Sequence, residues 1–169
     1  MFLCYNYDGD FMTIVIRKMQ ENDYQDLKKN VFCATDISII KENVKQNVLS
    51  MADNTSNWLY YVAEVDNKVV GTMYIEFNVP FVHRHIGTLY SVVVAKTYRG
   101  QGICRALFNE IIKVAKAKGC EMITLSVRGG TPAEIVYQKL GFIKYGLLPK
   151  GIKEEDHYFD SIFFYYPLI

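Results

Sequence analysis

Long apolar runs, paired cysteines and an excess of charge of one sign are all missing from this sequence. No run is long enough to span a bilayer, and residues 1–11 lack the basic start and apolar stretch of a secretory signal. Lysine plus arginine number 19 against 18 aspartate plus glutamate, so the formal net charge is only +1. A near-neutral chain has no general attraction to nucleic acid or to an anionic membrane, and we expect neither as a partner.

The four cysteines are scattered and form no CxxC pair. We interpret them as free thiols of a reducing compartment and therefore expect a cytoplasmic protein. The three histidines, His83, His85 and His157, show no spacing typical of metal ligands. We predict no metal site.

Internal repeats, Pro/Ser linkers and sustained charge runs are absent as well, so nothing in the sequence divides the chain. A length of 169 residues fits one domain with a sizeable core. The hydrophobic pattern begins near Met12, which makes Met12 an alternative to Met1 as the natural start. We expect a loose tail over residues 1–11 and a single domain over residues 12–169.

Hydrophobic periodicity predicts an alternation of strands and helices. Expected strands cover residues 13–17, 58–65, 68–77, 86–94, 121–127, 142–147 and 157–166. Expected helices cover residues 21–33, 37–51, 103–118 and 132–140. The pattern predicts a mixed α/β structure in which strand 86–94 is joined to a parallel strand 121–127 by the helix between them.

The most informative stretch is residues 98–105, YRGQGICR, between a central strand and an amphipathic helix. Amides at a helix start lack partners within the helix, and the helix dipole favours an anion there. Glycines let the backbone approach a phosphate closely, and Arg99 and Arg105 add positive charge. The P-loop pattern is absent, and Arg105 stands where the dinucleotide-binding pattern needs a third glycine. A phosphate cradle and a tight turn that binds nothing both fit this pattern.

Two segments together resemble a known family, the GCN5-related N-acetyltransferases (GNAT). Residues 94–104, VAKTYRGQGIC, resemble its acetyl-CoA motif, (R/Q)xxGx(G/A), with Arg99 and Gly102 matching and Cys104 where glycine or alanine is usual. Residues 133–142, AEIVYQKLGF, are similar to its AxxLYxxxGF segment. The resemblance covers nearly the whole chain beyond Met12.

The resemblance implies an α/β fold of the α+β type. Its mixed, mostly antiparallel central sheet has about six to seven strands, is flanked by helices and splays to admit acetyl-CoA. No other cofactor is implied. The implied acetyl-CoA-binding residues are Val92, Val93, Val94, Arg99, Gly100, Gln101, Gly102, Ile103, Cys104 and Arg105. Homodimers are common among such proteins, so a homodimer is a possible assembly.

The resemblance also implies the chemistry: transfer of an acetyl group from acetyl-CoA to a primary amine by direct attack in a ternary complex. Tyr137 matches the tyrosine that many relatives place near the thioester sulfur, and we expect it to act as the general acid; a core tyrosine is the alternative. Glu76 is a weak candidate for the base, with a solvated edge charge as the alternative. A non-catalytic CoA-binding sensor or partner-binding module is the competing function.

The acceptor is poorly encoded, and we favour a small amine over a protein. Residues 154–156 are consecutive acids that could attract a cationic amine or simply form a solvated turn. Four aromatic residues could line an acceptor pocket or belong to the core: Tyr24, Phe32, Trp58 and Phe81.

Overall fold

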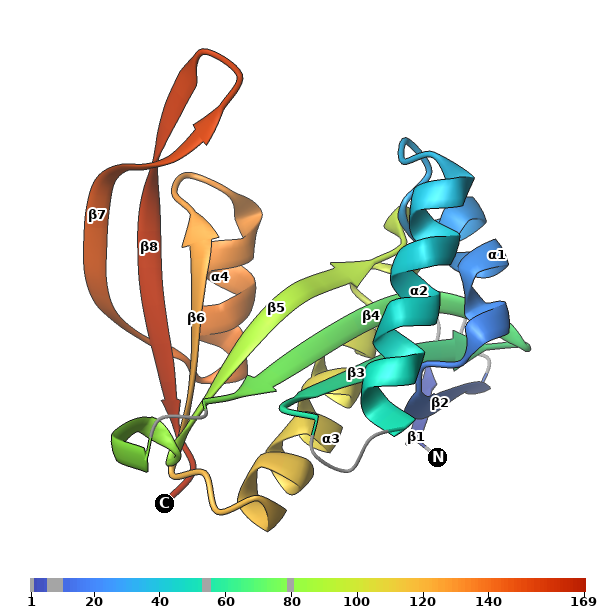
Figure 1. Ribbon diagram of the computed structural model, residues 1–169, viewed down its shortest axis with the longest axis horizontal. Helices are drawn as coiled ribbons and strands as arrows, with labels where there is room; N and C mark the ends of the chain where they lie inside the picture. Colours follow the sequence, from blue (N-terminus) through green and yellow to red (C-terminus); the bar gives the residue numbers. More distant parts are fainter. Residues whose placement is uncertain (1, 6–10, 53–55, 79–80) are drawn as a thin grey trace. The chain divides into compact units, whose positions relative to one another are not determined.

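Figure 1 shows the computed structural model, which describes residues 2–5, 11–52, 56–78 and 81–169. Its strands form one mixed sheet in the order β1-β2-β3-β4-β5-β6-β8-β7. The strands are β1 (Phe2–Tyr5), β2 (Phe11–Lys18), β3 (Trp58–Val65), β4 (Lys68–Phe77), β5 (Ile86–Val94), β6 (Met122–Arg128), β7 (Ile143–Glu154) and β8 (His157–Pro167). The helices are α1 (Tyr24–Asp26), α2 (Ile37–Ala52), α3 (Ile103–Ala117) and α4 (Pro132–Leu140). The predicted fold class is confirmed.

Strand β1 raises the number of strands to eight, above the six to seven expected. Part of the expected loose tail, Phe2–Tyr5, pairs antiparallel with β2, from Phe2 opposite Ile14 to Tyr5 opposite Phe11. A strand of four residues is too short to show hydrophobic periodicity, and its backbone hydrogen bonds come from its partner. The remainder of the expected tail, residues 1 and 6–10, lies outside the described residues. The single domain over residues 12–169 stays a prediction.

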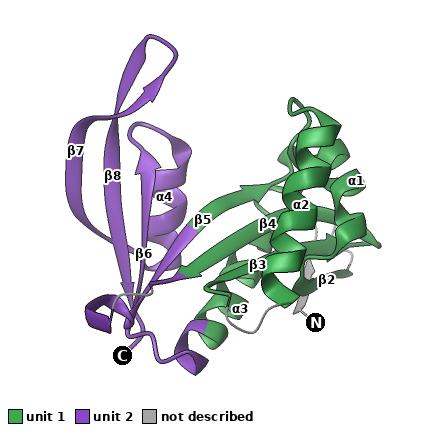
Figure 2. Cartoon of the chain, in the orientation of Figure 1, with its two compact units in different colours: residues 1–76, 90–114 green, residues 77–89, 115–169 purple. Residues whose placement is uncertain are grey.

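The chain consists of two compact units (Figure 2). Unit 1 comprises residues 1–76 and 90–114, and unit 2 comprises residues 77–89 and 115–169. Strand β5 contributes its first residues to unit 2 and its last residues to unit 1.

The β3–β4 hairpin is the centre of unit 1. Its two-residue turn, Asp66 and Asn67, has φ angles of 49° and 58°, the left-handed geometry that matches the twist of paired strands. At the start of β4, the Val69 amide donates to Asp26 Oδ2 (2.8 Å) and Asn30 Nδ2 donates to the Val69 carbonyl (2.9 Å). These two bonds hold the first helical segment against the hairpin.

The first helical segment departs from the regular helix expected over residues 21–33. It is a 3-10 turn (Glu21–Asp23), then α1, then a π-helical turn (Leu27–Val31). The buried Asp23 carboxylate accepts hydrogen bonds from the Gln20 amide (2.7 Å) and from both terminal nitrogens of Arg17 (2.7 and 2.8 Å). These side-chain contacts, which span three and six residues of the chain, stabilise the irregular start of the segment, and hydrophobic periodicity does not report them.

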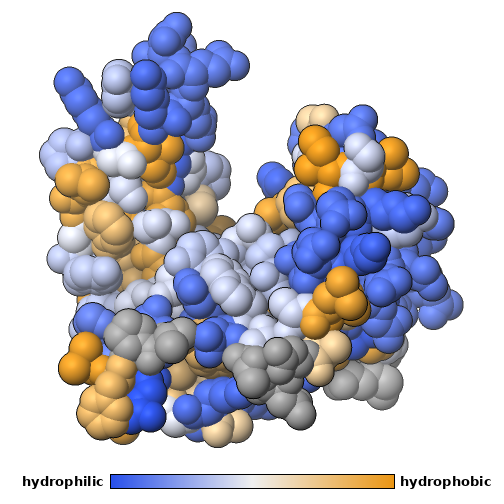
Figure 3. Space-filling view, in the orientation of Figure 1, coloured by the Kyte–Doolittle hydropathy of each residue, from blue (hydrophilic) through white to orange (hydrophobic). Residues whose placement is uncertain are grey.

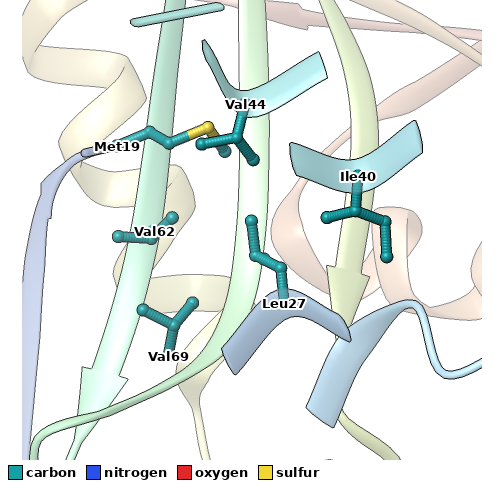
Figure 4. Packing of buried hydrophobic residues seen from close by; sticks show 6 residues of the cluster. All are labelled: Met19, Leu27, Ile40, Val44, Val62 and Val69. Atoms are coloured by element: carbon teal, nitrogen blue, oxygen red, sulfur yellow. The ribbon is translucent and has the colours of Figure 1, made fainter. Parts of the chain in front are cut away.

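An apolar cluster joins the helices of unit 1 to the hairpin (Figure 4). Figure 4 shows Leu27 and Val44 from the helical segments beside Val62 and Val69 of the two strands, with Ile40 further along the same cluster. All five are at most 4% exposed, so this layer is dry. Each buried aliphatic side chain contributes about 1.5–3 kcal/mol to folding relative to its exposed state.

Helix α3 packs against the opposite face of the hairpin, the face of Tyr61, whose pKa is raised by burial and by the charge of Glu110 on α3. The predicted apolar face of the helix is confirmed. Its buried residues are Ile103, Ala106, Leu107, Phe108, Ile111 and Ala115. The helix ends at Ala117, and Gly119 just beyond it has a φ of 79°, the left-handed conformation common after a helix C-terminus.

In unit 2, β5 and β6 form the predicted parallel pair, with Ile86–Thr88 opposite Met122–Thr124. Strand β8 pairs antiparallel with both β6 and β7. Strand β7 extends to Glu154 rather than to residue 147, because irregularities at Lys144/Gly146 and Leu148/Ile152 interrupt the alternation on which the prediction depended. In Figure 3 the tip of the β7–β8 hairpin is hydrophilic, whereas apolar side chains of the same unit are exposed nearer its base.

Candidate active site

The loop between β5 and α3 is held in place where it leaves β5. The Ala95 amide donates to the Val70 carbonyl of β4 (2.7 Å), and Arg99 Nε donates to the Val94 carbonyl (3.1 Å). Gly100 and Gly102 have φ angles of 78° and 79°, which only glycine adopts readily. Arg99 therefore shapes this loop by holding the end of β5, in addition to supplying charge.

The start of α3 presents backbone donors. The Ala106 amide donates to the Gly102 carbonyl (2.9 Å), which is the first hydrogen bond of the helix in the part of the chain that the structure describes. The amides of Gly102, Ile103 and Cys104 come before that bond, at the positive end of a 15-residue helix. This geometry suits a diphosphate, as the sequence predicts.

Gly71 of β4 lies directly beneath this loop, and the sequence did not reveal its importance. A Cβ at Gly71 would lie 3.1 Å from the Val93 carbonyl oxygen and 3.4 Å from the Ile103 side chain. A side chain at position 71 would crowd the Val93 carbonyl, so glycine suits the close passage of β4 by the end of β5 and the first turn of α3. A lone glycine inside a strand pattern was the available signal.

The Cys104 thiol is unsuited to covalent chemistry. Burial raises its pKa to about 11, an effect that the nearby Arg105 charge only partly opposes. The thiol therefore stays protonated at neutral pH, although its position at a helix start would by itself favour the thiolate. Cys104 therefore serves as a partly buried residue in the first turn of α3.

A cavity of about 480 Å³ opens within unit 1, between the first two helical segments and strands β3, β4 and β5. None of the described residues that line it carries a charged side chain. The lining residues are Leu27, Phe32, Thr35, Ile40, Asn43, Val44, Asn47, Trp58, Tyr60, Tyr74, Tyr90 and Ser91. Phe32 and Trp58 line it as predicted, whereas Tyr24 packs on the core cluster and Phe81 is 79% exposed.

The aromatic wall of the cavity follows from strand pairing. Trp58 lies opposite Glu76, and Tyr60 lies opposite Tyr74, so the four side chains share one face of the β3–β4 hairpin. The Tyr60 and Tyr74 rings are 4.5 Å apart, and Trp58 lies 6.2 Å from Tyr60 and 5.2 Å from Tyr90. In the sequence, this wall is visible only as residues two positions apart on each strand: 58 and 60 on β3, and 74 and 76 on β4.

Tyr90 and Ser91 both line the cavity although they are consecutive residues of a strand. Neighbouring strand residues ordinarily point to opposite faces. Ser91 has a φ of 47°, which breaks the alternation. The cavity wall therefore runs along β5 directly into Val92–Val94, the segment that the family resemblance implies binds acetyl-CoA.

Glu76 lies beside this wall. Burial raises the pKa of Tyr90. The charge of Glu76 and a hydrogen bond with Glu76 raise the pKa of Tyr90 further. Burial also raises the pKa of Tyr60, an effect that a hydrogen bond with Ser50 opposes and the Glu76 charge reinforces. Glu76 is half-buried at the aromatic wall, and its role as a base stays a prediction.

Tyr137 lies on α4 in unit 2, where it is buried. Its ring is 5.5 Å from Phe142 in an edge-to-face arrangement and 6.4 Å from Phe164. The helix is placed as the sequence predicts: Pro132 opens it and Gly141, with a φ of 101°, closes it. These contacts fix the orientation of the ring, and the proposed acid role stays a prediction.

Comparison with known proteins bears on this arrangement. The model of the Acetyltransferase (GNAT) family matches residues 24–142, which include the helical segments, the cavity, the β5–α3 loop and α4. The chain belongs to the GNAT acetyltransferase family. Acetyltransferase SG1711 of Sodalis glossinidius is 36% identical over 104 residues, which are 59% of this chain and 70% of that protein.

Solved structures share the fold of this GNAT acetyltransferase. The protein yncA from Salmonella typhimurium, solved with its cofactor acetyl-CoA, has a TM-score of 0.72 at 17% identity and covers 92% of this chain and 94% of its own. The ribosomal-protein-alanine N-acetyltransferase of Brucella melitensis has a TM-score of 0.70 at 23% identity, and the match covers 90% of this chain and 99% of that protein.

Other candidate groups of this GNAT acetyltransferase lie on its surface. His83 is exposed, and Glu154 forms an ion pair with Arg128 beside the turn of the β7–β8 hairpin. Within the described ranges, no three His, Cys, Asp or Glu side chains come together as a metal site. None of the described helices has both the length and the apolarity needed to cross a membrane.

Proposed function

We propose that this chain transfers the acetyl group of acetyl-CoA to the nitrogen of a primary amine by direct attack in a ternary complex. The observation that carries the proposal is the continuity of β5. Tyr90 and Ser91 line the uncharged cavity, Val92–Val94 follow at once, and the glycine loop leads into α3. An amine in the cavity and a thioester along Val92–Val94 would therefore be bound by successive residues.

Glu76 receives the proton of the amine in this proposal. An alkylammonium has a pKa of about 10.4, so only about one molecule in 10³ is neutral near pH 7, and forming the neutral amine costs about 4–5 kcal/mol. A carboxylate at the aromatic wall offsets part of this cost by accepting the proton, directly or through water. The neutral nitrogen then attacks the thioester carbonyl carbon.

Tyr137 supplies a proton to the leaving group. As the C–N bond forms, the C–S bond breaks and the sulfur leaves with its electron pair. A phenol is protonated at neutral pH and can donate to that sulfur. The transfer needs no acetyl-cysteine, because the elevated pKa of Cys104 disfavours a nucleophilic thiolate.

The backbone cradle is tested by titrating acetyl-CoA calorimetrically into wild type, Gly102→Glu and Gly119→Glu. Both glycines adopt left-handed conformations on the flanks of α3, with φ angles of 79°. The two variants therefore carry the same backbone strain and added charge. We expect Gly102→Glu to lose binding, because it places a carboxylate among the phosphate-binding amides, and Gly119→Glu to retain it. Equal affinity in all three proteins would contradict the cradle.

Catalysis is tested separately by mass spectrometry of amines incubated with the protein and acetyl-CoA. An acetylated amine that appears only with active protein supports the transferase. Tight acetyl-CoA binding with no acetylation of any amine or peptide would favour the alternative, a non-catalytic CoA-binding sensor or partner-binding module.

A further inference from the structure

We infer that the acceptor is a small amine with a single positive charge and an apolar or aromatic body, and that the cavity of unit 1 rejects diamines and polyamines. The inference rests on the proposed function and specifies its acceptor. It is carried by the distribution of charge around the cavity.

Within the part of the chain that the structure describes, the cavity offers one place for a cation. None of its twelve described lining residues is acidic, and the Glu76 carboxylate beside Tyr60 and Tyr90 is the acid that joins the aromatic wall. Burial raises the pKa of Tyr60, Tyr74 and Tyr90, so these phenols stay neutral. Neutral aromatic faces next to a carboxylate attract one ammonium group by cation–π and Coulomb interactions.

The rest of the cavity suits an uncharged body. The helical side is formed by Leu27, Phe32, Ile40 and Val44, together with the uncharged polar side chains of Thr35, Asn43 and Asn47. A second ammonium at this end would lose part of its hydration and would meet no counter-charge among these residues, which is costly. The volume of about 480 Å³ lies within the range of about 300–1,000 Å³ typical of small-molecule sites.

Hexylamine and 1,6-diaminohexane test the inference, because they differ only in the second amino group. We expect kcat/KM for hexylamine to exceed that for the diamine by about tenfold or more. The side chain of Trp58, the sole tryptophan of the chain, lines the cavity, so its fluorescence reports amine binding without turnover. We expect hexylamine to change this fluorescence at lower concentration than the diamine.

Asn47→Asp sharpens the test, because it adds a carboxylate to the helical side of the cavity. It should raise kcat/KM for the diamine relative to hexylamine by about tenfold. Asn67→Asp is the matched control. It makes the same substitution in the exposed turn at the other end of the β3–β4 hairpin, and it should leave the ratio unchanged.

The outcomes separate this inference from the proposed function. Wild-type preference for the diamine, equal fluorescence responses to both amines, or transfer confined to peptide N-termini would overturn the inference and leave the transferase intact. Selective binding of hexylamine with no acetylation of any amine would overturn the transferase and support the charge selectivity of the cavity.

Discussion

Trp58 and Glu76 lie directly opposite each other in the β3–β4 ladder, so a carboxylate and an indole share one face of the hairpin. Tyr60 and Tyr74 form the next pair of that face, and Tyr90 joins it from β5 through its hydrogen bond with Glu76. One acid is thereby placed at the edge of an otherwise uncharged aromatic wall. This placement makes Glu76 the residue whose substitution tests the proposed chemistry most directly.

Glu76→Gln should lower kcat/KM for amine acetylation by about 10²-fold, because the variant keeps the shape of the side chain and loses the proton acceptor. It should also lower the pKa of Tyr90, since the Glu76 charge and hydrogen bond raise that pKa in the wild type. Steady-state kinetics and a spectrophotometric tyrosine titration measure the two effects. Glu42→Gln, on the exposed side of α2, should change neither. Unaltered kinetics in Glu76→Gln would remove the base assignment.

Tyr137→Phe should lower kcat by about 10- to 100-fold and leave the fold intact, because the ring keeps its packing on Phe142 and Phe164 and only the proton donor is lost. Product formation and thermal unfolding are measured on the same samples. Tyr145→Phe, at an exposed position of β7, makes the same change and should retain full activity. Full turnover in Tyr137→Phe would identify Tyr137 as a core tyrosine only.

Cys104 predicts a specific loss of stability at alkaline pH. Its pKa is raised by burial from 9.0 to about 11 in the folded state, so the folded protein holds this proton more tightly than the unfolded chain does. The stabilisation is fully present below about pH 9 and disappears as the pH rises toward 11, a decrease of about 2 kcal/mol. Urea unfolding at pH 8 and pH 10.5 measures it. In Cys104→Ala, the free energy of unfolding should fall by about 2 kcal/mol less between these two pH values than in the wild type. The same pH dependence in wild type and variant would refute the raised pKa of Cys104.

The thiols should also differ in reactivity. At pH 7.5, iodoacetamide should label exposed Cys33 much faster than Cys104, which is half-buried and protonated. Peptide mass spectrometry after timed quenching distinguishes the two sites. Preferential labelling of Cys104 in the native protein would mean that it forms a reactive thiolate and would reopen a covalent route.

Arg17 should contribute more to the free energy of unfolding than an exposed arginine that also pairs with a carboxylate. It donates to the buried Asp23 and to half-buried Glu64. Arg17→Met would leave Asp23 without its counter-charge, at a cost of about 2–3 kcal/mol. Arg128→Met breaks the exposed pair with Glu154 and should cost less than about 1 kcal/mol. Denaturant unfolding compares them, and equal losses would show that burial does not decide the contribution.

Local patterns were sufficient for most of the architecture. The apolar face of α3, the Asp66-Asn67 turn and the proline and glycine that bound α4 depend on neighbours within a few residues, and each lies where the sequence predicts. Strand β1 and the end of β7 were missed because a very short strand and an irregular one show no alternation.

The sequence alone determined the glycine turn at the start of α3 and the family to which it points, because a helix terminus and its glycines are properties of consecutive residues. Only the tertiary structure decided which aromatic residues form the cavity, why glycine suits position 71 and where Glu76 lies. Those facts depend on the register of β3 against β4, on the left-handed Ser91 and on the close passage of β4 beneath β5. Strand register and interstrand distance join residues far apart along the chain, and no local pattern encodes them.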